Sequence, residues 1–387
     1  MKKTKQLLVG LGLALWQVAY AETGSGTGVG WGALNLPAGV TETSHDIHDL
    51  HMLILWICVG IGVLVYGILI YSLVHHRKSK GAVPATFHEN FKLEIVWTII
   101  PFLILLGMAI PATKVMIKAY DTTKSVMTIK VTGYQWKWRY EYQGDDKYGS
   151  QGISFFSALD AKSNEARQIG SKIDPTTVPH YLLNVDNPLV IPVNKKIRIL
   201  LTAADVLHAW WVPEFGWKKD AIPGFVTDGW IKVEKPGIYR GQCAELCGRD
   251  HGFMPIVVIA KTEDEYKAWV EEQKAKTSVK KADANKTYTL AELIEKGKAV
   301  YDSNCAACHM PGGEGIPGAF PAIKGSPVAN GPVDEHIKLV AKGRNAMPAF
   351  DEILAPDELA AVVVFQRNSF GNSKGELIQP ADIQKQQ

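Results

Sequence analysis

Four of the five cysteines in this 387-residue chain stand in two tight pairs, and each pair suggests its own chemistry. Cys305 and Cys308 lie in the segment CAACH, directly before His309. This spacing is typical of covalent haem attachment, in which two thioether bonds hold the vinyl groups and the histidine reaches the iron from one side. A zinc or redox pair could use the same cysteines but would leave the histidine without a role. We therefore predict a covalently bound haem c.

A haem that only passes electrons needs a second axial ligand, and methionine is one that raises the potential. Met347 lies downstream in NAMPAF, where Pro348 would fix its loop, whereas Met310 is too close to His309 to reach the opposite face. Core packing is the ordinary role of a lone methionine. Because the haem requires a ligand, we favour Met347.

The second pair lies in the segment GQCAELCGRDHGFMP, residues 241 to 255. It gathers thiolate, imidazole and thioether groups at Cys243, Cys247, His251 and Met254. Thiolate and imidazole ligands together select copper. The methionine favours copper over zinc, because a zinc site would need no methionine. A disulfide between the two cysteines is chemically permitted outside the cytoplasm. Its short loop would remove little entropy from the unfolded chain, and the disulfide would leave the histidine and methionine unexplained.

The copper residues follow a region rich in short strands. Residues 126 to 142 alternate with a period of two, which predicts one strand with its aromatic side chains on a single face: Tyr134, Trp136, Trp138, Tyr140 and Tyr142. Further strand-like runs with turn signals between them follow at 189–202, 230–233 and 255–259. This spacing predicts an antiparallel sandwich or barrel from about 120 to 260.

A short helix should close the barrel, because Thr262 and Glu265 form a capping-box pattern. The lysine-rich segment 274–286 has no apolar periodicity and is expected to be a solvated linker.

The residues after this linker predict an all-helical domain, near 290 to 372, whose middle is loop. Thr289 and Glu292 repeat the capping-box pattern before a helix through Tyr301, and 356–368 reads as a closing helix with Pro356 in its first turn. Such a domain needs something large to pack on, as the predicted haem would provide.

The N-terminus reads as an export signal over 1–21, with Lys2, Lys3 and Lys5 before an apolar run and the cleavage site after Ala21. A third spanning helix is the alternative, but the run from Leu7 to Val18 is shorter than the roughly 18 apolar residues that a span needs.

Two longer apolar runs, 53–74 and 95–113, can each cross a bilayer and together form a hairpin. Four basic residues lie between them, whereas 22–49 contains no lysine or arginine. The asymmetry places the connecting loop in the cytoplasm and both chain ends outside.

Length and composition agree with several parts and exclude a nucleic-acid role. At roughly 150 residues per domain, the chain should contain two or three domains. Its 42 basic residues are spread among 39 acidic ones, with a net charge of +3, so no basic face is available to bind a polyanion.

With these motifs, residues from about 45 to 270 closely resemble subunit II of haem-copper cytochrome c oxidases. The resemblance implies a cupredoxin barrel that carries the binuclear CuA centre, in which two coppers share both cysteines. It implies the following ligands, Glu245 acting through its backbone carbonyl: His208, Cys243, Glu245, Cys247, His251 and Met254. His208 alone would read as a structural histidine, but the surrounding DVLHAWWVPEFGWKKDAIPG matches the family. Asp205 matches by position a residue that could tune the centre.

The same resemblance assigns three further roles. Trp136 matches the tryptophan that admits electrons near CuA, although periodicity alone makes it a strand aromatic. Glu94 matches a glutamate at a proton-uptake entrance, or it is an interfacial charge at a helix end. The Glu245 side chain resembles a ligand to a magnesium ion shared with subunit I. Cys58, in the first span, receives no role.

The last domain resembles class I cytochromes c throughout. The resemblance extends to Gly297 and Tyr301, where the first helix of that family crosses the last closely. The expected parts of the chain are then a signal peptide at 1–21, an N-terminal segment and hairpin at 22–118 with spans at about 50–75 and 94–114, a cupredoxin domain at 119–261, a short helix and linker at 262–288, a cytochrome c domain at 289–372 and a tail at 373–387.

The resemblance implies the electron-entry subunit of a respiratory cytochrome c oxidase that translocates protons. Electrons would pass from the haem to CuA and on to a haem in subunit I, where oxygen is reduced. The implied partners are subunits I and III and a periplasmic or membrane donor such as a cytochrome c or the quinol-oxidising complex. The implied location is a bacterial inner membrane, with both cofactor domains on its outer side. Nitrous oxide reductase, a copper-bearing nitric oxide reductase, a quinol-oxidase subunit and a free-standing membrane cytochrome are the alternatives.

Overall fold

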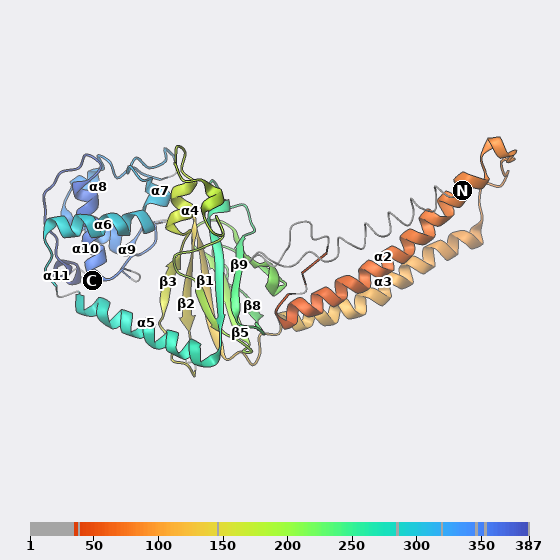
Figure 1. The fold of residues 1–387 in the computed structure, drawn as a ribbon, viewed down its shortest axis with the longest axis horizontal. Coiled ribbons are helices and arrows are strands. Elements are labelled where there is room, and N and C mark those ends of the chain that lie inside the picture. The colour runs from red at the N-terminus through yellow and green to blue at the C-terminus, as the bar shows by residue number, and fades with distance from the viewer. Residues whose placement is uncertain are drawn as a thin grey trace.

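The computed structural model describes residues 35–37, 39–144, 147–283, 286–318, 320–344, 347–351 and 354–385, so the predicted signal peptide lies outside it. Three parts follow one another along the longest axis of the molecule (Figure 1). A helical hairpin leads into a β barrel, and a small helical domain lies against the far side of the barrel. The predicted combination of a two-helix anchor, a cupredoxin-like domain and a helical domain is confirmed.

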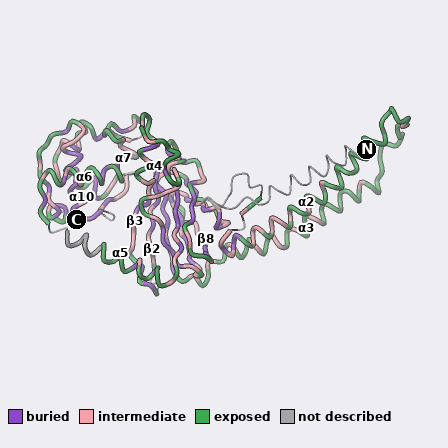
Figure 2. Tube along the Cα trace, in the orientation of Figure 1, coloured by how far each residue is buried: buried purple, intermediate pink, exposed green. Residues whose placement is uncertain are grey.

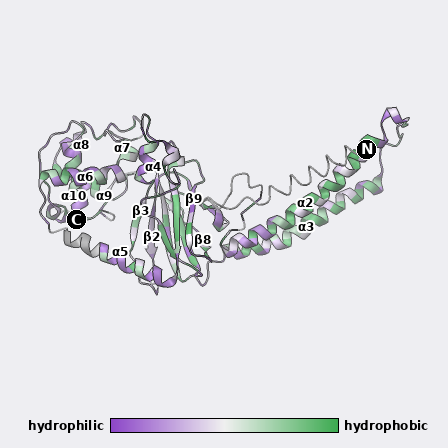
Figure 3. Cartoon of the chain, in the orientation of Figure 1, coloured by the Kyte–Doolittle hydropathy of each residue, from purple (hydrophilic) through white to green (hydrophobic). Residues whose placement is uncertain are grey.

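The hairpin consists of α2 (Glu42–His75) and α3 (Phe91–Tyr120), joined through the 3₁₀ turn η1 (Lys78–Lys80). Both helices are long and apolar enough to cross a membrane, and they extend beyond the expected spans at their barrel-proximal ends. Along both helices most residues are exposed and many are hydrophobic, as the colours of Figures 2 and 3 show. A helix that is apolar all round and unburied is suited to a lipid or protein environment rather than to water.

Polar contacts fix the hairpin to the barrel. Lys118 Nζ lies 2.8 Å from Glu42 Oε1 and 2.6 Å from Asp46 Oδ2, which joins the two helices at this end. The hydroxyl of Thr41, which caps α2, donates to the carbonyl of Phe215 in the barrel over 2.7 Å. The orientation of the barrel relative to the anchor is therefore set by buried hydrogen bonds as well as by chain connection.

The barrel packs two five-stranded sheets, in the orders β3-β2-β1-β5-β8 and β4-β10-β9-β6-β7, around one apolar core. The strands are β1 (Met127–Tyr134), β2 (Lys137–Gln143), β3 (Ser154–Ser157), β4 (Leu189–Pro192), β5 (Ile197–Ala203), β6 (His208–Val212), β7 (Trp217–Ala221), β8 (Thr227–Ile231), β9 (Gly237–Cys243) and β10 (Pro255–Lys261). Short helices between them are α4 (Ala161–Ala166), η2 (Pro175–Thr177), η3 (Pro213–Phe215) and η4 (His251–Phe253). The pairs β1 with β5 and β4 with β10 are parallel, so the expected purely antiparallel arrangement is wrong there.

The single strand predicted over 126–142 is a hairpin. The chain turns at Gln135 and Trp136, and Tyr134 pairs with Lys137 across the turn. The alternation of buried and less buried residues continues through the turn, because the side chains of β2 point inward with the same period as those of β1. Neither turn residue is the glycine or asparagine that usually indicates a tight turn. The run 189–202 likewise divides into β4 and β5, which lie in different sheets.

The expected linker after the barrel is helical for most of its length. Helix α5 spans Glu263–Asp283, and its capping box between Thr262 and Glu265 is confirmed. The helix does not end near residue 274, because alanine, lysine and glutamate have high helix propensity and Glu272 pairs with Lys276 over 2.8 Å. The connection to the next domain is therefore a helix rather than a solvated coil.

The last domain is helical, as predicted, with α6 (Leu290–Asn304), α7 (Ala306–His309), α8 (Pro327–Asn330), α9 (Val333–Lys342), α10 (Pro356–Asn368) and α11 (Pro380–Gln384). The capping box at the start of α6 and the bounds of α10 are confirmed. A Cβ added to Gly297 would lie 2.0 Å from the carbonyl oxygen of Ala361, so only glycine permits the close crossing of α6 and α10.

The segment expected to be a separate tail is part of this domain. Ile378 and Ile383 are buried in its core, and the side chain of Gln379 exchanges two hydrogen bonds with the backbone of Tyr288. The sequence shows little apolar periodicity after residue 372, because only a few tail side chains enter the core.

Candidate metal and haem centres

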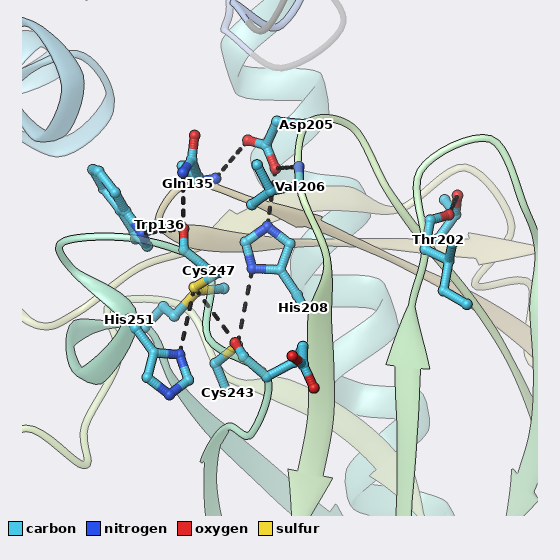
Figure 4. A network of polar contacts seen from close by, with 12 residues as sticks. Gln135, Trp136, Thr202, Asp205, Val206, His208, Cys243, Cys247 and His251 are labelled. Carbon is cyan, nitrogen blue, oxygen red and sulfur yellow. Dashed lines mark hydrogen bonds and ion pairs between the residues drawn. The ribbon is translucent and has the colours of Figure 1, made fainter. Parts of the chain in front are cut away.

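Four of the six predicted copper ligands lie side by side in Figure 4, although they come from separate elements: His208, Cys243, Cys247 and His251. His208 begins β6 and Cys243 ends β9. Cys247 lies in the following loop, His251 begins η4, and Met254 immediately precedes β10. The barrel thus folds the loop between β9 and β10 back over the first residue of β6.

The donor atoms lie close together. The Sγ atoms of Cys243 and Cys247 are 3.9 Å apart, and Cys243 Sγ is 3.9 Å from His208 Nδ1. Cys247 Sγ is 3.5 Å from His251 Nδ1 and 3.6 Å from Met254 Sδ. The backbone carbonyl of Glu245, the sixth predicted ligand, lies 3.4 Å from Cys243 Sγ.

These residues fit a copper centre better than a disulfide. Both cysteines are free and buried, and their sulfurs are well beyond the roughly 2.05 Å of a disulfide bond. A hydrogen bond between the two thiols couples them: it lowers the pKa of Cys243 and raises the pKa of Cys247, and a hydrogen bond with His208 lowers the pKa of Cys243 further. A thiolate at Cys243, beside a second sulfur, an imidazole and a thioether, makes a donor set that binds copper.

Asp205 orients His208 from the side opposite the cysteines. Its Oδ1 atom lies 2.9 Å from His208 Nε2, and it also accepts hydrogen bonds from the backbone amides of Gln135 and Val206, each over 2.7 Å. Burial alone would lower the pKa of His208, but the hydrogen bonds to Asp205 and Cys243 outweigh it and raise the pKa. The ring is thereby fixed with Nδ1 toward the sulfurs.

The predicted electron-entry residue, Trp136, lies beside the centre. Its Nε1 donates to the carbonyl of Cys247 over 3.2 Å, and the side-chain amide of Gln135 donates to the same oxygen over 2.8 Å. Both residues of the turn between β1 and β2 therefore contact the backbone of Cys247, a predicted copper ligand. Sequence reasoning missed Gln135, because a glutamine in a tight turn carries no pattern of its own.

The helical domain presents the haem motif on α7. Cys305 is buried and Cys308 half-buried, and His309 Nδ1 lies 2.8 Å from the carbonyl of Pro321. That hydrogen bond makes Nδ1 the protonated nitrogen and leaves Nε2 as the ligand atom, so these residues fit a haem c.

The two methionines near the haem motif differ in environment. Met347 packs against the apolar core of the helical domain, and its backbone exchanges two hydrogen bonds with that of Arg344. The sulfur of Met310 faces the barrel, where Arg249 Nη2 lies 3.5 Å away. The role of Met347 as the axial ligand stays a prediction.

Glu94 lies in the first turn of α3, where its carboxylate accepts a hydrogen bond from the backbone amide of Asn90 over 3.2 Å. The Glu94 carboxylate thus binds a backbone amide at the start of α3. The role of Glu94 in proton uptake stays a prediction.

Three family models match the chain in the order of its parts. Residues 29–115 match the transmembrane domain of cytochrome c oxidase subunit II, and 127–261 match the periplasmic domain of that subunit. Residues 292–365 match subunit III of cbb3-type cytochrome c oxidase.

Two relatives agree with the first two matches. A probable cytochrome c oxidase subunit 2 of Rickettsia bellii is 38% identical over 58% of this chain and 78% of its own length. The cytochrome c oxidase subunit 2 of Cereibacter sphaeroides is 34% identical over 64% of this chain and 82% of its own. The chain belongs to the cytochrome c oxidase subunit II family. Among solved structures, the periplasmic domain of subunit II from Bradyrhizobium japonicum is 41% identical and covers 40% of this chain and 98% of its own, with a TM-score of 0.33.

This subunit II therefore combines a membrane anchor, an external copper-binding domain and a fused cytochrome c domain, and it is part of a haem-copper oxidase complex. Within the described residues, the cluster of His208, Cys243 and Cys247 is the group whose ligand atoms lie close enough together to hold a metal ion.

Proposed function

We propose that this subunit II is the electron-entry subunit of its oxidase and that its own haem c reduces its own CuA centre. CuA then passes electrons to the haem of subunit I, where oxygen is reduced to water with proton translocation. A periplasmic or membrane donor, such as a cytochrome c or the quinol-oxidising complex, supplies electrons to the haem. Subunits I and III are the partners, and the complex lies in a bacterial inner membrane.

One contact carries this proposal. The Sγ atom of Cys308, a predicted haem-attachment residue, lies 3.4 Å from the carbonyl oxygen of Gln135. The side chain of the same glutamine donates a hydrogen bond to the carbonyl of Cys247, a predicted copper ligand, over 2.8 Å. A single residue therefore joins the two sites, and Trp136 offers a second connection to the same carbonyl.

The residues that hold the copper support electron transfer rather than catalysis. When two copper ions are bound through both cysteines, the centre shares one electron over both metals, so its geometry changes little between redox states. His208, His251, Met254 and the carbonyl of Glu245 complete the set. Burial of both cysteines excludes water from the sulfurs, and Asp205 holds His208 in place.

The remaining assignments concern the haem and the contacts with subunit I. His309 and Met347 would supply the two axial ligands of a bound haem, and the domain would then pass electrons rather than bind oxygen. The carboxylate of Glu245 contributes to a magnesium ion shared with subunit I, and Glu94 lies at the entrance of a proton path.

Metal and haem analysis of the complex purified in mild detergent tests the assignments. We expect two copper ions and one covalent haem for each copy of this chain, together with a large catalytic subunit. Zinc in place of copper, or a chain that purifies without the large subunit, would contradict the proposal. The second outcome would favour a free-standing membrane cytochrome.

Rapid-mixing or flash reduction of the same complex tests the electron path. Transfer from haem to CuA should be first-order, independent of protein concentration and only weakly slowed by salt. A rate that scales with protein concentration would mean that the haem does not serve its own CuA centre.

A further inference from the structure

Lys137 is a buried lysine between the barrel and the haem domain. It begins β2, directly after Trp136, and only 7% of the residue is exposed. Burial lowers the pKa of its ammonium group. In the part of the chain that the structure describes, no carboxylate lies within ion-pair distance of its Nζ. Asp186 attracts the ammonium group from beyond ion-pair distance, but a buried cation without an ion-paired carboxylate needs further compensation, because desolvation of a charge is costly.

That compensation comes from both domains. Nζ lies 4.1 Å from the centre of the Phe156 ring in the barrel and 5.3 Å from the centre of the Phe350 ring in the haem domain. Both distances are within the range of a cation–π interaction. The ammonium also donates a hydrogen bond to the carbonyl of Asn304 over 3.2 Å.

The position of Asn304 gives this hydrogen bond a specific role. Asn304 is the last residue of α6, so its carbonyl is among those that lack an intrahelical partner. The C-terminal end of a helix carries partial negative charge, which favours a cation there. Lys137 therefore satisfies a helix end of the haem domain that the haem domain itself leaves open.

Asn304 also directly precedes the haem-attachment segment. A contact that fixes Asn304 fixes Cys305 and, three residues later, Cys308, whose sulfur lies 3.4 Å from the carbonyl of Gln135. The ring of Phe320 packs edge-on against Trp136 at 6.1 Å between centroids, on the same surface. The lysine thus lies where a small shift of the haem domain would separate the two redox sites.

We propose that Lys137 is a positioning residue that docks the haem domain on the copper domain of its own chain and keeps Cys308 beside Gln135. This inference rests on the proposed function, because it concerns the rate of transfer from haem to CuA. It assigns the role to the charged end of the lysine, not to the packing of its stem.

The test compares Lys137→Met and Lys137→Arg in the complete oxidase complex, with Lys130→Met as the matched control. Methionine keeps the apolar stem and removes the charge, whereas arginine keeps the charge. Lys130 is a half-buried lysine on the neighbouring strand β1, and it pairs with Glu141 of β2 over 3.2 Å. Transfer from haem to CuA is measured by flash reduction, and copper and haem contents by absorption.

In Lys137→Met we expect electron transfer from haem to CuA to slow by about tenfold, because one charged hydrogen bond between the domains is lost. Copper and haem contents should be normal. Lys137→Arg should recover most of the rate, and Lys130→Met should match the unaltered protein. Onward transfer from CuA, started with a small reductant that reduces CuA directly, should be unchanged in all three.

An unaltered rate in Lys137→Met, or an arginine variant as slow as the methionine variant, would overturn the inference. Loss of copper in Lys137→Met would also overturn it, since the residue would then support its own barrel. Absence of transfer from haem to CuA in the unaltered complex would instead refute the proposed function, so the two failures are distinguishable.

Discussion

The carboxylate of Asp205 lies 2.9 Å from His208 Nε2, while Nδ1 of the same ring faces Cys243 Sγ at 3.9 Å. A carboxylate in this position fixes the tautomer of a ligand histidine and raises its basicity. In Asp205→Asn we therefore expect copper affinity to fall by about 10- to 100-fold. Copper titration of the metal-free protein measures this. Asp228→Asn, which alters a surface pair with Arg198, is the control. Equal affinities in both variants would exclude the positioning role.

Removal of the Cys243 sulfur should affect the copper centre and leave the haem unaffected. Cys243→Ser is expected to abolish the near-infrared absorption of the copper pair while the haem stays covalently bound, because the cysteine pairs lie in different domains. Cys58→Ser changes the free cysteine in the membrane helix and should leave both spectra unchanged. Intact copper absorption in Cys243→Ser would refute the ligand assignment.

Gly133 provides the space for the ring of His208. A Cβ at this position would lie 2.7 Å from His208 Cδ2, so Gly133→Ala must displace the ring or the strand. We expect weaker copper binding and a loss of about 1–3 kcal/mol in the free energy of unfolding, the usual effect of overpacking. Gly252→Ala lies next to ligand His251 but meets no atom within 4 Å, and should be neutral. Denaturant titration with copper analysis would show whether the two variants differ.

The axial methionine can be identified by replacing each candidate and testing whether an axial position of the haem iron becomes vacant. Met347→Leu should free the sixth position of the iron, so that the reduced haem domain binds carbon monoxide. Met310→Leu should not, because the sulfur of Met310 faces Arg249. Absorption spectra of the reduced protein with and without carbon monoxide measure the difference. Binding in the Met310 variant alone would reverse the assignment.

His336 should make the stability of the haem domain depend on pH. Burial lowers its pKa to about 4, and its Nε2 lies 2.9 Å from Gln366 Oε1, with Arg367 and Glu376 as charged neighbours. In the unfolded chain the histidine has a pKa of about 6.5, so between about pH 6.5 and 4 it binds a proton in the unfolded state but not in the folded state. The free energy of unfolding therefore falls as pH drops through this range. The full loss is about 3 kcal/mol.

Denaturation of the haem domain, followed by haem absorption at pH 7 and pH 5, measures the effect. His336→Gln should reduce the difference between the two pH values. A pH dependence identical in both proteins would place its origin in other groups.

Much of the site could be predicted from sequence because its ligands are local. Cys243, Cys247, His251 and Met254 lie within twelve residues at the end of β9 and in the loop after it, and Cys305, Cys308 and His309 lie at and within one short helix, so their spacing keeps each set together. His208 comes from another strand, and only resemblance could assign it. Gln135 and Lys137 were missed because their importance depends on contact between two domains, which no pattern along the chain encodes.

The fold was predicted least well where local signals conflict with tertiary structure. The hairpin at Gln135 and Trp136 preserves the alternation of a single strand, so period alone could not reveal the turn. The segment after residue 274 lacks an apolar stripe and was expected to be coil, yet its helix propensity is high. The tail contributes only two buried isoleucines, too few to form a recognisable pattern.

Helix α5 has a thermodynamic consequence for the two cofactor domains. Its 21 residues form a rod of about 32 Å at 1.5 Å per residue. A coil of the same length would lose conformational entropy on docking, at about 1–2 kcal/mol for each backbone residue that became fixed. Because the hydrogen bonds of the helix hold most of this connection in one conformation, the chain has less conformational entropy to lose on docking than a coil would have.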